Sequence, residues 1–416
     1  MGVFAETQSQ LEVELCDLRA NISPTSCLCV VNGATPLPTD QCVVQLAPEP
    51  PGIVHQQVDL TTVTGRILDD KEIVADPERN ENFHDSCSAL KEYIGEDRMP
   101  DDITLLNIFG KIVVNTFSIL NDDMNAIGSG LYLQLSALNH SCDPDCVVQF
   151  DGAFAVLAAL RSDGMIHERI SENTISYIDL LASTKERQKL LTERYYFTCT
   201  CANCMNVSKD LEKSSLKCFQ NSCDGQVLIH SGLDHGECNK CGQLYEDVML
   251  GMFMMQKAVW DMQKLTQLKE NHDILSCFPY IPCLHLDTAY KYCMVVIKQQ
   301  RQVLHPLNIH LVRALDFAFD VCIELQKWHY AAQFGLFTLA AYKSYYPANH
   351  PLTGLQLMKI GKILLYNGEL EQAKSLLCQA YSILTVTRGA DHPLCCSLVD
   401  MITQCEGEMH SRGIQN

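Results

Sequence analysis

The 416-residue chain is poor in basic side chains and lacks long apolar runs. Lys and Arg total 31 against 50 Asp and Glu, giving a formal net charge of −19. This shortage of cations argues against general phosphate or nucleic-acid binding, which depends on clustered Lys and Arg. No run of eighteen apolar residues occurs, so no membrane span is expected. The acidic surface suits either a cationic partner, such as a lysine-bearing peptide, or simple solubility.

A basic segment is also missing from the amino terminus, MGVFAETQSQLEVEL, where acids come early. We therefore expect no secretory signal and an intracellular protein. In that setting the 22 cysteines are expected to be reduced thiols, some of them bound to metal. The chain is long enough for two or three domains, and a hydrophobic content of 47% excludes a wholly disordered chain.

Local signals predict several elements before residue 190. Residues 6–20 favour a helix, and the proline-rich range 32–51 favours a loop. Asp151-Gly152 lies between two β-rich runs and predicts a hairpin, and Ser183 with Glu186 predicts a capping box at a helix start. Helical spacing predicts one buried helix, and β-branched residues predict a further strand. These elements are the helix at 103–120, the hairpin strands at 146–150 and 153–157, and the strand at 173–179.

From Met249 onward the pattern is helical and repetitive. His-Pro-Leu recurs at 305–307, 350–352 and 392–394, at spacings of 45 and 42 residues, and Asn367-Gly368 separates two helical runs. Small and apolar residues fall where the two helices of a tetratricopeptide-type repeat touch. These residues are Ala331, Gly361, Leu364, Ala373, Leu377 and Ala380. A plain helical bundle is the alternative, but the triple His-Pro-Leu register favours a repeat array.

Two motifs together point to a family. Residues 128–146, GSGLYLQLSALNHSCDPDC, run from apolar residues into Asn139-His140-Ser141-Cys142, which alone is equally consistent with a polar loop. Residues 195–204 then read YYFTCTCANC. In this order the motifs resemble the carboxy-terminal half of a SET domain, and specifically the SET- and MYND-domain (SMYD) lysine methyltransferase family. The resemblance covers residues 50–205 and 300–410.

The chain departs from this family in two regions. The resemblance implies a glycine-rich cofactor loop and a MYND zinc finger upstream, and the sequence contains neither. The amino-terminal cysteines, which lack the finger's spacing, are Cys16, Cys27, Cys29 and Cys42. The family's Gly-Glu-Glu-Leu segment is replaced by a longer, altered segment at residues 161–174. The resemblance therefore supplies no residues for the upstream half of a cofactor pocket.

The resemblance and the helical pattern together imply an α+β fold: a SET-type β-rich domain with a post-SET zinc segment, followed by an all-α tetratricopeptide-like repeat domain. The expected divisions are an unassigned segment at 1–50, a partial SET domain at 51–198, the cysteine-rich zinc segment at 199–248, and the helical repeats at 249–416.

The resemblance implies methyl transfer from S-adenosylmethionine to a lysine amine, whose reference pKa is about 10.4. The amine must lose its proton and lie in near-attack geometry inside a narrow channel. Tyr177 matches the family's catalytic tyrosine, and Tyr195 and Phe197 match aromatic residues that close the channel. The implied cofactor-binding residues are Asn115, Ser136, Leu138, Asn139, His140, Tyr177 and Phe197. For Tyr177 the alternative is a core strand tyrosine, and for Asn115 it is a buried capping residue.

Two cysteine sets are candidate zinc sites. The first resembles the family's post-SET site, in which four thiolates suit tetrahedral structural zinc. The second has the spacing of a zinc ribbon with two knuckles, with Gly225 and Gly242 after the ligand pairs. His230 and His235 are alternative ligands there, and ordinary free thiols are the alternative for the whole set. The sets are Cys142, Cys199, Cys201 and Cys204, and then Cys218, Cys223, Cys238 and Cys241.

The resemblance implies a protein-lysine N-methyltransferase acting on histone or non-histone lysines in the nucleus and cytoplasm. A non-catalytic scaffold is the alternative, favoured by the missing glycine-rich loop. In either case the helical repeats are a candidate surface for a chaperone or another protein. Neither direct nucleic-acid binding nor a membrane is expected.

Overall fold

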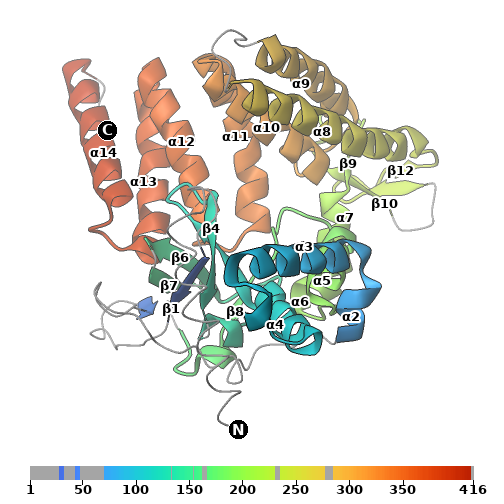
Figure 1. Ribbon diagram of the computed structural model, residues 1–416. Coiled ribbons are helices and arrows are strands. Elements are labelled where there is room, and N and C mark those ends of the chain that lie inside the picture. Colours follow the sequence, from blue (N-terminus) through green and yellow to red (C-terminus); the bar gives the residue numbers. More distant parts are fainter. Residues whose placement is uncertain are drawn as a thin grey trace. The chain divides into compact units, whose positions relative to one another are not determined.

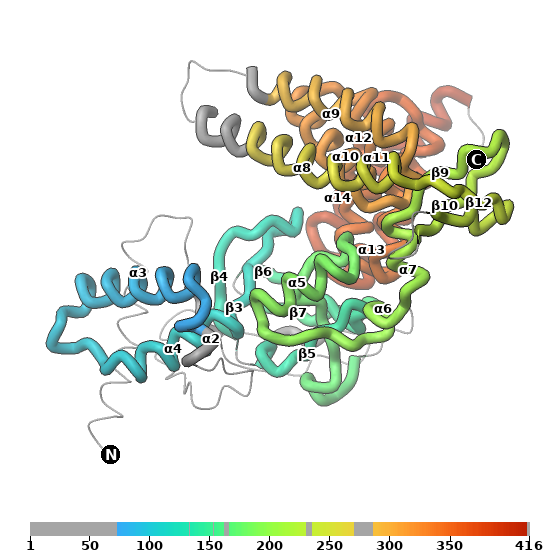
Figure 2. Tube along the Cα trace, turned by 90° about the vertical axis from the view of Figure 1, so that its right-hand side faces the viewer, coloured from blue at the N-terminus to red at the C-terminus, as the bar shows by residue number. Residues whose placement is uncertain are grey.

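The computed structural model describes residues 28–31, 43–46, 70–132, 134–152, 154–161, 166–229, 235–276 and 284–413 (Figures 1 and 2). The chain divides into two compact units, which we describe separately. Unit 1 is Met1–Ala159 with Asp163–Ile175, and unit 2 is Leu160–Ser162 with Ser176–Asn416. The helix expected at residues 6–20 lies outside the described residues, and the domain boundaries expected from the sequence stay predictions.

Three helices lie within residues 70–115 of unit 1. An aspartate carboxylate caps two of them: Asp76 accepts the backbone N–H of Glu78 at 3.1 Å, and Asp101 accepts that of Thr104 at 3.0 Å. The rings of Phe83 and Phe109 pack edge to face with centroids 5.4 Å apart. The helices are α2 (Asp70–Ala75), α3 (Pro77–Ile94) and α4 (Asp102–Asn115), with a 3₁₀ turn η3 (Glu96–Arg98).

The helix predicted for residues 103–120 is present as α4 from Asp102, but its predicted end and the predicted burial of Ile103 are wrong. Ile103, expected in the core, is 69% exposed. After Asn115 the chain becomes strand β3 (Thr116–Leu120), because these β-branched and aromatic residues pair antiparallel with β4 (Ala126–Tyr132). Helical spacing alone could not reveal a pairing that depends on a later segment.

Three small sheets complete unit 1. In the first, β1 (Leu28–Val31) pairs in parallel with β4. In the second, β7 (Phe154–Ala159) lies between β2 (Val43–Leu46) and β6 (Cys146–Asp151), all antiparallel. The third joins β5 (Asn139–His140) in parallel with β8 (Thr174–Ile175). The remaining turns are η4 (Leu135–Ala137) and η5 (Ile170–Glu172).

The hairpin prediction is confirmed, since Asp151 pairs with Phe154 across the turn. Two other expectations are corrected. Residues 43–46, in the range expected to be a loop, form β2 because β7 offers them a partner strand. The strand predicted at 173–179 is only Thr174–Ile175, because Ser176 Oγ donates to the carbonyl of Ile178 at 2.7 Å and turns the chain.

Unit 2 begins with α5, whose predicted capping box between Ser183 and Glu186 is present. Short helices and a four-stranded antiparallel sheet, ordered β12-β11-β10-β9, follow. The elements are α5 (Thr184–Tyr195), α6 (Ala202–Met205), α7 (Val207–Lys213), β9 (Leu216–Lys217), β10 (Gln226–Ile229), β11 (Gly236–Cys238) and β12 (Leu244–Tyr245).

The rest of unit 2 is a series of helices, each packed on its neighbours in sequence, as the last three show in Figure 1. The residues expected at helix contacts, including Ala331, Ala373 and Leu377, are completely buried. A Cβ atom on Gly361 would lie 2.8 Å from the Leu377 side chain, so α12 and α13 approach so closely there that a larger residue would have to displace Leu377. The helices are α8 (Met249–Ser276), α9 (Leu284–Val303), α10 (Ile309–Glu324), α11 (Trp328–Tyr345), α12 (Pro351–Asn367), α13 (Leu370–Arg388) and α14 (Pro393–Ser411).

The three His-Pro-Leu motifs share one local structure. In each, histidine Nδ1 accepts the backbone N–H of the leucine two residues later, at 3.2 Å for His305, 3.3 Å for His350 and 3.2 Å for His392. His350 and His392 are thereby the N-caps of α12 and α14, with proline at the first helical position. Among the described helices, none combines the length and apolar character that a membrane crossing requires.

Candidate functional site

Unit 1 holds five of the predicted cofactor-binding residues. Asn115 is buried at the end of α4, and its Nδ2 donates to the carbonyl of Lys111 at 2.8 Å. Ser136 lies in η4, where its Oγ donates to the carbonyl of Tyr132, and Leu138 is the buried residue that ends this turn. The bond from Asn115 to its own helix supports the capping interpretation, and its cofactor role stays a prediction.

Asn139 and His140 form β5, held in place by the segment around β8. The backbone N–H of Ser141 donates to the carbonyl of Ile175 at 3.0 Å, continuing the parallel ladder. Asn139 is exposed, and Nε2 of His140 lies 3.2 Å from the Sγ of Cys142. The Asn139 amide is therefore accessible to a ligand at a position fixed by backbone hydrogen bonds.

A residue outside the family motif supports this loop. Asn173 is completely buried; its Nδ2 donates to the carbonyls of His167 and Arg169, and its Oδ1 accepts the backbone N–H of His167 at 2.8 Å. The next residue, Thr174, donates to the Asp145 carboxylate at 2.8 Å. No local pattern could have predicted this role, because an asparagine before a strand is an ordinary turn residue.

Unit 2 brings together the three aromatic residues predicted to be catalytic. The ring centroid of Tyr177 lies 4.9 Å from that of Tyr195 and 6.4 Å from that of Phe197. Tyr196 explains how both neighbours reach one ring: it caps α5 in the left-handed conformation, with φ of 56°, and so turns the chain between them. Burial, and then the neighbouring Tyr195, raise the pKa of Tyr177 to about 12. Tyr177 is therefore a neutral phenol at physiological pH.

Cys199, Cys201 and Cys204 also lie together in unit 2, with sulfur atoms within 4.8 Å of one another. Gln188 of α5 fixes the first of them, donating to the carbonyl of Cys199 at 2.6 Å and accepting its N–H at 2.8 Å. Arg187 Nη2 donates to the Cys204 Sγ at 3.7 Å. Three such thiols suit zinc. Cys142 belongs to unit 1, so its place as the fourth ligand stays a prediction from the family resemblance.

The second cysteine set, Cys218, Cys223, Cys238 and Cys241, forms a compact thiol cluster on the four-stranded sheet. The Sγ atoms of Cys218 and Cys241 are 3.7 Å apart, and those of Cys223 and Cys238 are 3.8 Å apart. Four thiolates about 2.3 Å from a central zinc ion would be separated by roughly 3.8 Å, so the donor set fits tetrahedral zinc. His235 is exposed and outside the cluster, and His230 lies outside the described residues.

Backbone geometry shapes this cluster. The N–H of Gly225 donates to the Cys223 Sγ at 3.4 Å, and a Cβ atom at Gly225 would lie 2.5 Å from the Cys238 Sγ. The Tyr245 hydroxyl lies 3.1 Å from the Cys218 Sγ. The cluster therefore has hydrogen-bond donors directed at its sulfur atoms, as expected around metal-bound thiolates.

Comparison with known proteins gives a consistent set of relatives. No protein-family model matches the chain. The mouse histone-lysine N-methyltransferase SMYD3 is 26% identical over 378 residues, covering 89% of this chain and 74% of the relative. The human histone-lysine N-methyltransferase SMYD3 is 29% identical, over 76% of this chain and 62% of the relative. The Arabidopsis thaliana histone-lysine N-methyltransferase ASHR1 is also 29% identical, over 72% of this chain and 60% of the relative. This chain thus spans less than two thirds of several relatives' own length.

Among solved structures, a putative kinesin light chain with TPR-like repeats from Podosopora anserina aligns with 36% of this chain and 68% of its own. The sequence identity is 14% and the TM-score is 0.28, too low to define the fold.

Proposed function

Because this chain is similar over most of its length to SMYD-family lysine methyltransferases, we propose that it transfers a methyl group from S-adenosylmethionine to lysine side chains of histone or non-histone proteins. The observation that carries the proposal is the packing of Tyr195 and Phe197 on the half-buried ring of Tyr177. These are the aromatic positions the family resemblance assigns to the lysine channel. We place this activity in the cytoplasm and nucleus.

The aromatic cluster has a direct chemical role in this proposal. Rings that exclude water disfavour a charged ammonium and so promote the neutral amine that attacks. The Tyr177 hydroxyl, kept protonated by burial, accepts or donates a hydrogen bond and orients the amine. No strong base is needed. Tyr195 and Phe197 limit the movement of the Tyr177 ring and thereby of its hydroxyl.

Asn139 and His140 are the residues proposed to hold the cofactor. The exposed Asn139 amide offers donors and an acceptor for polar groups of a ligand, while the ladder to β8 holds it still. S-adenosylmethionine, when bound, supplies an electrophilic methyl on a sulfonium. The two cysteine sets hold structural zinc in this proposal, since sites with four thiolates leave no open coordination position.

Two measurements on the full chain test the proposal: S-adenosylmethionine affinity by calorimetry, and methyl transfer to lysine peptides from radiolabelled cofactor. We expect micromolar-range binding and transfer to a lysine peptide that is lost when its lysine is replaced by arginine. A folded chain that neither binds the cofactor nor transfers a methyl group would refute the enzyme assignment.

A non-catalytic scaffold is the second candidate, favoured by the absence of the glycine-rich cofactor loop from the sequence. In that case the α8–α14 repeats bind a chaperone or another protein. Calorimetry separates the candidates, because a scaffold has no requirement for S-adenosylmethionine.

A further inference from the structure

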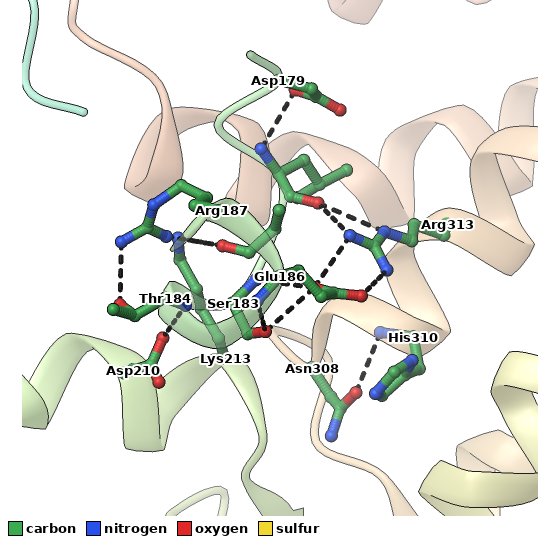
Figure 3. Close-up of polar contacts among 12 residues, drawn as sticks. Asp179, Ser183, Thr184, Glu186, Arg187, Asp210, Lys213, Asn308, His310 and Arg313 are labelled. Carbon is green, nitrogen blue, oxygen red and sulfur yellow. Dashed lines mark hydrogen bonds and ion pairs between the residues drawn. The ribbon is translucent and has the colours of Figure 1, made fainter. Parts of the chain in front are cut away.

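Three consecutive backbone carbonyls after Tyr177, those of Leu180, Leu181 and Ala182, each accept hydrogen bonds from cationic side chains. Figure 3 shows the three cationic side chains, Lys213, Arg187 and Arg313. Lys213 Nζ donates to the carbonyls of Leu180 at 3.2 Å and Ala182 at 2.8 Å. Arg187 Nη1 also donates to Ala182 at 2.6 Å, and Arg313 Nη2 donates to Leu181 at 2.7 Å. The cations come from α7, α5 and α10, so three separate helices meet on one short non-helical segment, residues 180–182.

This arrangement is buried. Leu180, Leu181 and Ala182 are at most 4% exposed, and Lys213 and Arg187 are 2% and 1% exposed. Outside a helix or sheet, buried carbonyls require other donors, and buried cations require acceptors. Here the cations supply the donors that these carbonyls require, and the Lys213 ammonium also lies 5.1 Å from the ring centroid of Tyr345. The backbone of the segment therefore has little freedom to move.

A second set of hydrogen bonds fixes Asp179, which is only two residues after Tyr177. The Asp179 carboxylate oxygen Oδ1 accepts the backbone N–H of Leu181 at 3.0 Å and the hydroxyl of Tyr346 at 2.6 Å. Tyr346 follows the end of α11 and is 7% exposed. A residue of the helical repeats thus fixes a side chain two positions from Tyr177.

Arg313 connects this segment with the other side of the aromatic cluster. The guanidinium that donates to the Leu181 carbonyl also donates to both carboxylate oxygens of Glu186, at 2.8 and 3.1 Å. Glu186 belongs to the capping box of α5, and the last residue of that helix is Tyr195. Arg313 of α10 therefore contacts both the backbone that follows Tyr177 and the first turn of the helix whose last residue is Tyr195.

We propose that Arg313, Lys213 and Tyr346 are positioning residues, through which the helical repeats set the packing of Tyr177 on Tyr195 and thereby the shape of the lysine channel. The kinetic part of this inference rests on the proposed methyltransferase function, but the structural part does not. The repeats are then part of the catalytic apparatus as well as a candidate partner surface.

The test uses the full chain with 3-fluorotyrosine incorporated at position 177, observed by ¹⁹F NMR, together with kcat and KM for a lysine peptide. Tyr346→Phe removes the hydroxyl bound to Asp179 and keeps the ring. Arg313→Lys keeps the charge but cannot make the paired contacts to Leu181 and Glu186. Tyr342→Phe is the matched control, because it removes a buried phenol–carboxylate hydrogen bond, to Asp316, one turn away.

We expect Tyr346→Phe and Arg313→Lys to change the ¹⁹F resonance and to lower kcat about tenfold or more, with little change in KM. Tyr342→Phe should lower the Tm similarly and leave the resonance unchanged. An unchanged resonance in both folded test variants would overturn the inference, and so would an equal change in the control. If the resonance responds as expected but wild type transfers no methyl group, the positioning stands and the proposed function fails.

Discussion

The rings of Tyr177 and Tyr195 pack against each other with centroids 4.9 Å apart and planes inclined by 48°. Replacing Tyr177 by phenylalanine keeps its ring and therefore keeps this ring–ring contact. The Tyr177 hydroxyl can therefore be removed while the aromatic packing on Tyr195 is retained.

Tyr177→Phe is expected to leave the Tm and the affinity for S-adenosylmethionine nearly unchanged while methyl transfer falls roughly a hundredfold. In the proposed mechanism the lost hydroxyl acts on the amine and not on the cofactor. His140→Ala should instead weaken cofactor binding. Calorimetry and radiolabel transfer on both variants measure this, and an equally active Tyr177→Phe would assign catalysis to another residue.

The pH dependence of methyl transfer tests whether Tyr177 or the substrate amine titrates. Because the pKa of Tyr177 is raised to about 12, its phenol does not ionise between pH 7 and pH 10. We expect the wild-type rate to rise with pH as the substrate amine, with a reference pKa of about 10.4, loses its proton. Tyr177→Phe should retain that slope at a lower rate. A slope that disappears in the variant would mean that Tyr177 itself titrates.

Acid stability depends on the contact between Glu186 and Arg313. Burial acts to raise the pKa of Glu186, but the hydrogen bonds and charge of Arg313 and the bonds from Ser183 outweigh it and lower the pKa to about 2. A folded pKa below the ordinary value of 4.5 gives stability that is present above pH 4.5 and lost as the pH falls toward 2.

Glu186→Gln should therefore weaken the pH dependence of the Tm between about pH 4.5 and pH 2. Glu193→Gln, on the same helix and in the exposed pair with Lys189, is the control and should keep the wild-type dependence. Thermal scans at several pH values measure the Tm of each variant. If the Tm of wild type and of Glu186→Gln fell equally with pH, the lowered pKa of Glu186 would not be a source of acid-dependent stability.

Metal content tests the two cysteine sets separately. We predict two zinc ions per chain by mass spectrometry, one ion after Cys238→Ser, and one after Cys201→Ser. Cys396→Ser changes an exposed thiol outside both sets and should retain two. A single ion in wild type that is retained in Cys238→Ser and lost in Cys201→Ser would show that Cys218, Cys223, Cys238 and Cys241 are ordinary thiols.

Ala373→Leu should overpack the contact between α12 and α13 and reduce the free energy of unfolding by about 1–3 kcal/mol. Ala373 is completely buried, and its carbonyl faces Gly361. Ala340→Leu makes the same change at an exposed position of α11 and should be nearly neutral. Denaturant unfolding of both variants compares them, and equal stabilities would mean that the two helices do not pack closely at Ala373.

Local signals predicted those features whose causes are local. The capping box of Ser183 and Glu186 and the hairpin at Asp151-Gly152 each depend on residues only a few positions apart. The strand after Asn115 and the strand at Val43–Leu46 could not be predicted in this way, because their partners lie elsewhere in the chain. The same is true of Arg313, whose contact with Leu181 spans 132 residues and leaves no mark in either local sequence.

The close approach at Gly225 limits how this sequence can vary. A side chain there would collide with the Cys238 sulfur and, at 2.8 Å, with the Cβ of Lys240. Relatives that retain the four ribbon cysteines should therefore retain glycine at this position, although glycine offers the metal no ligand. A relative that has lost the thiols is released from this restriction, so the glycine and the cysteines are expected to disappear together during evolution.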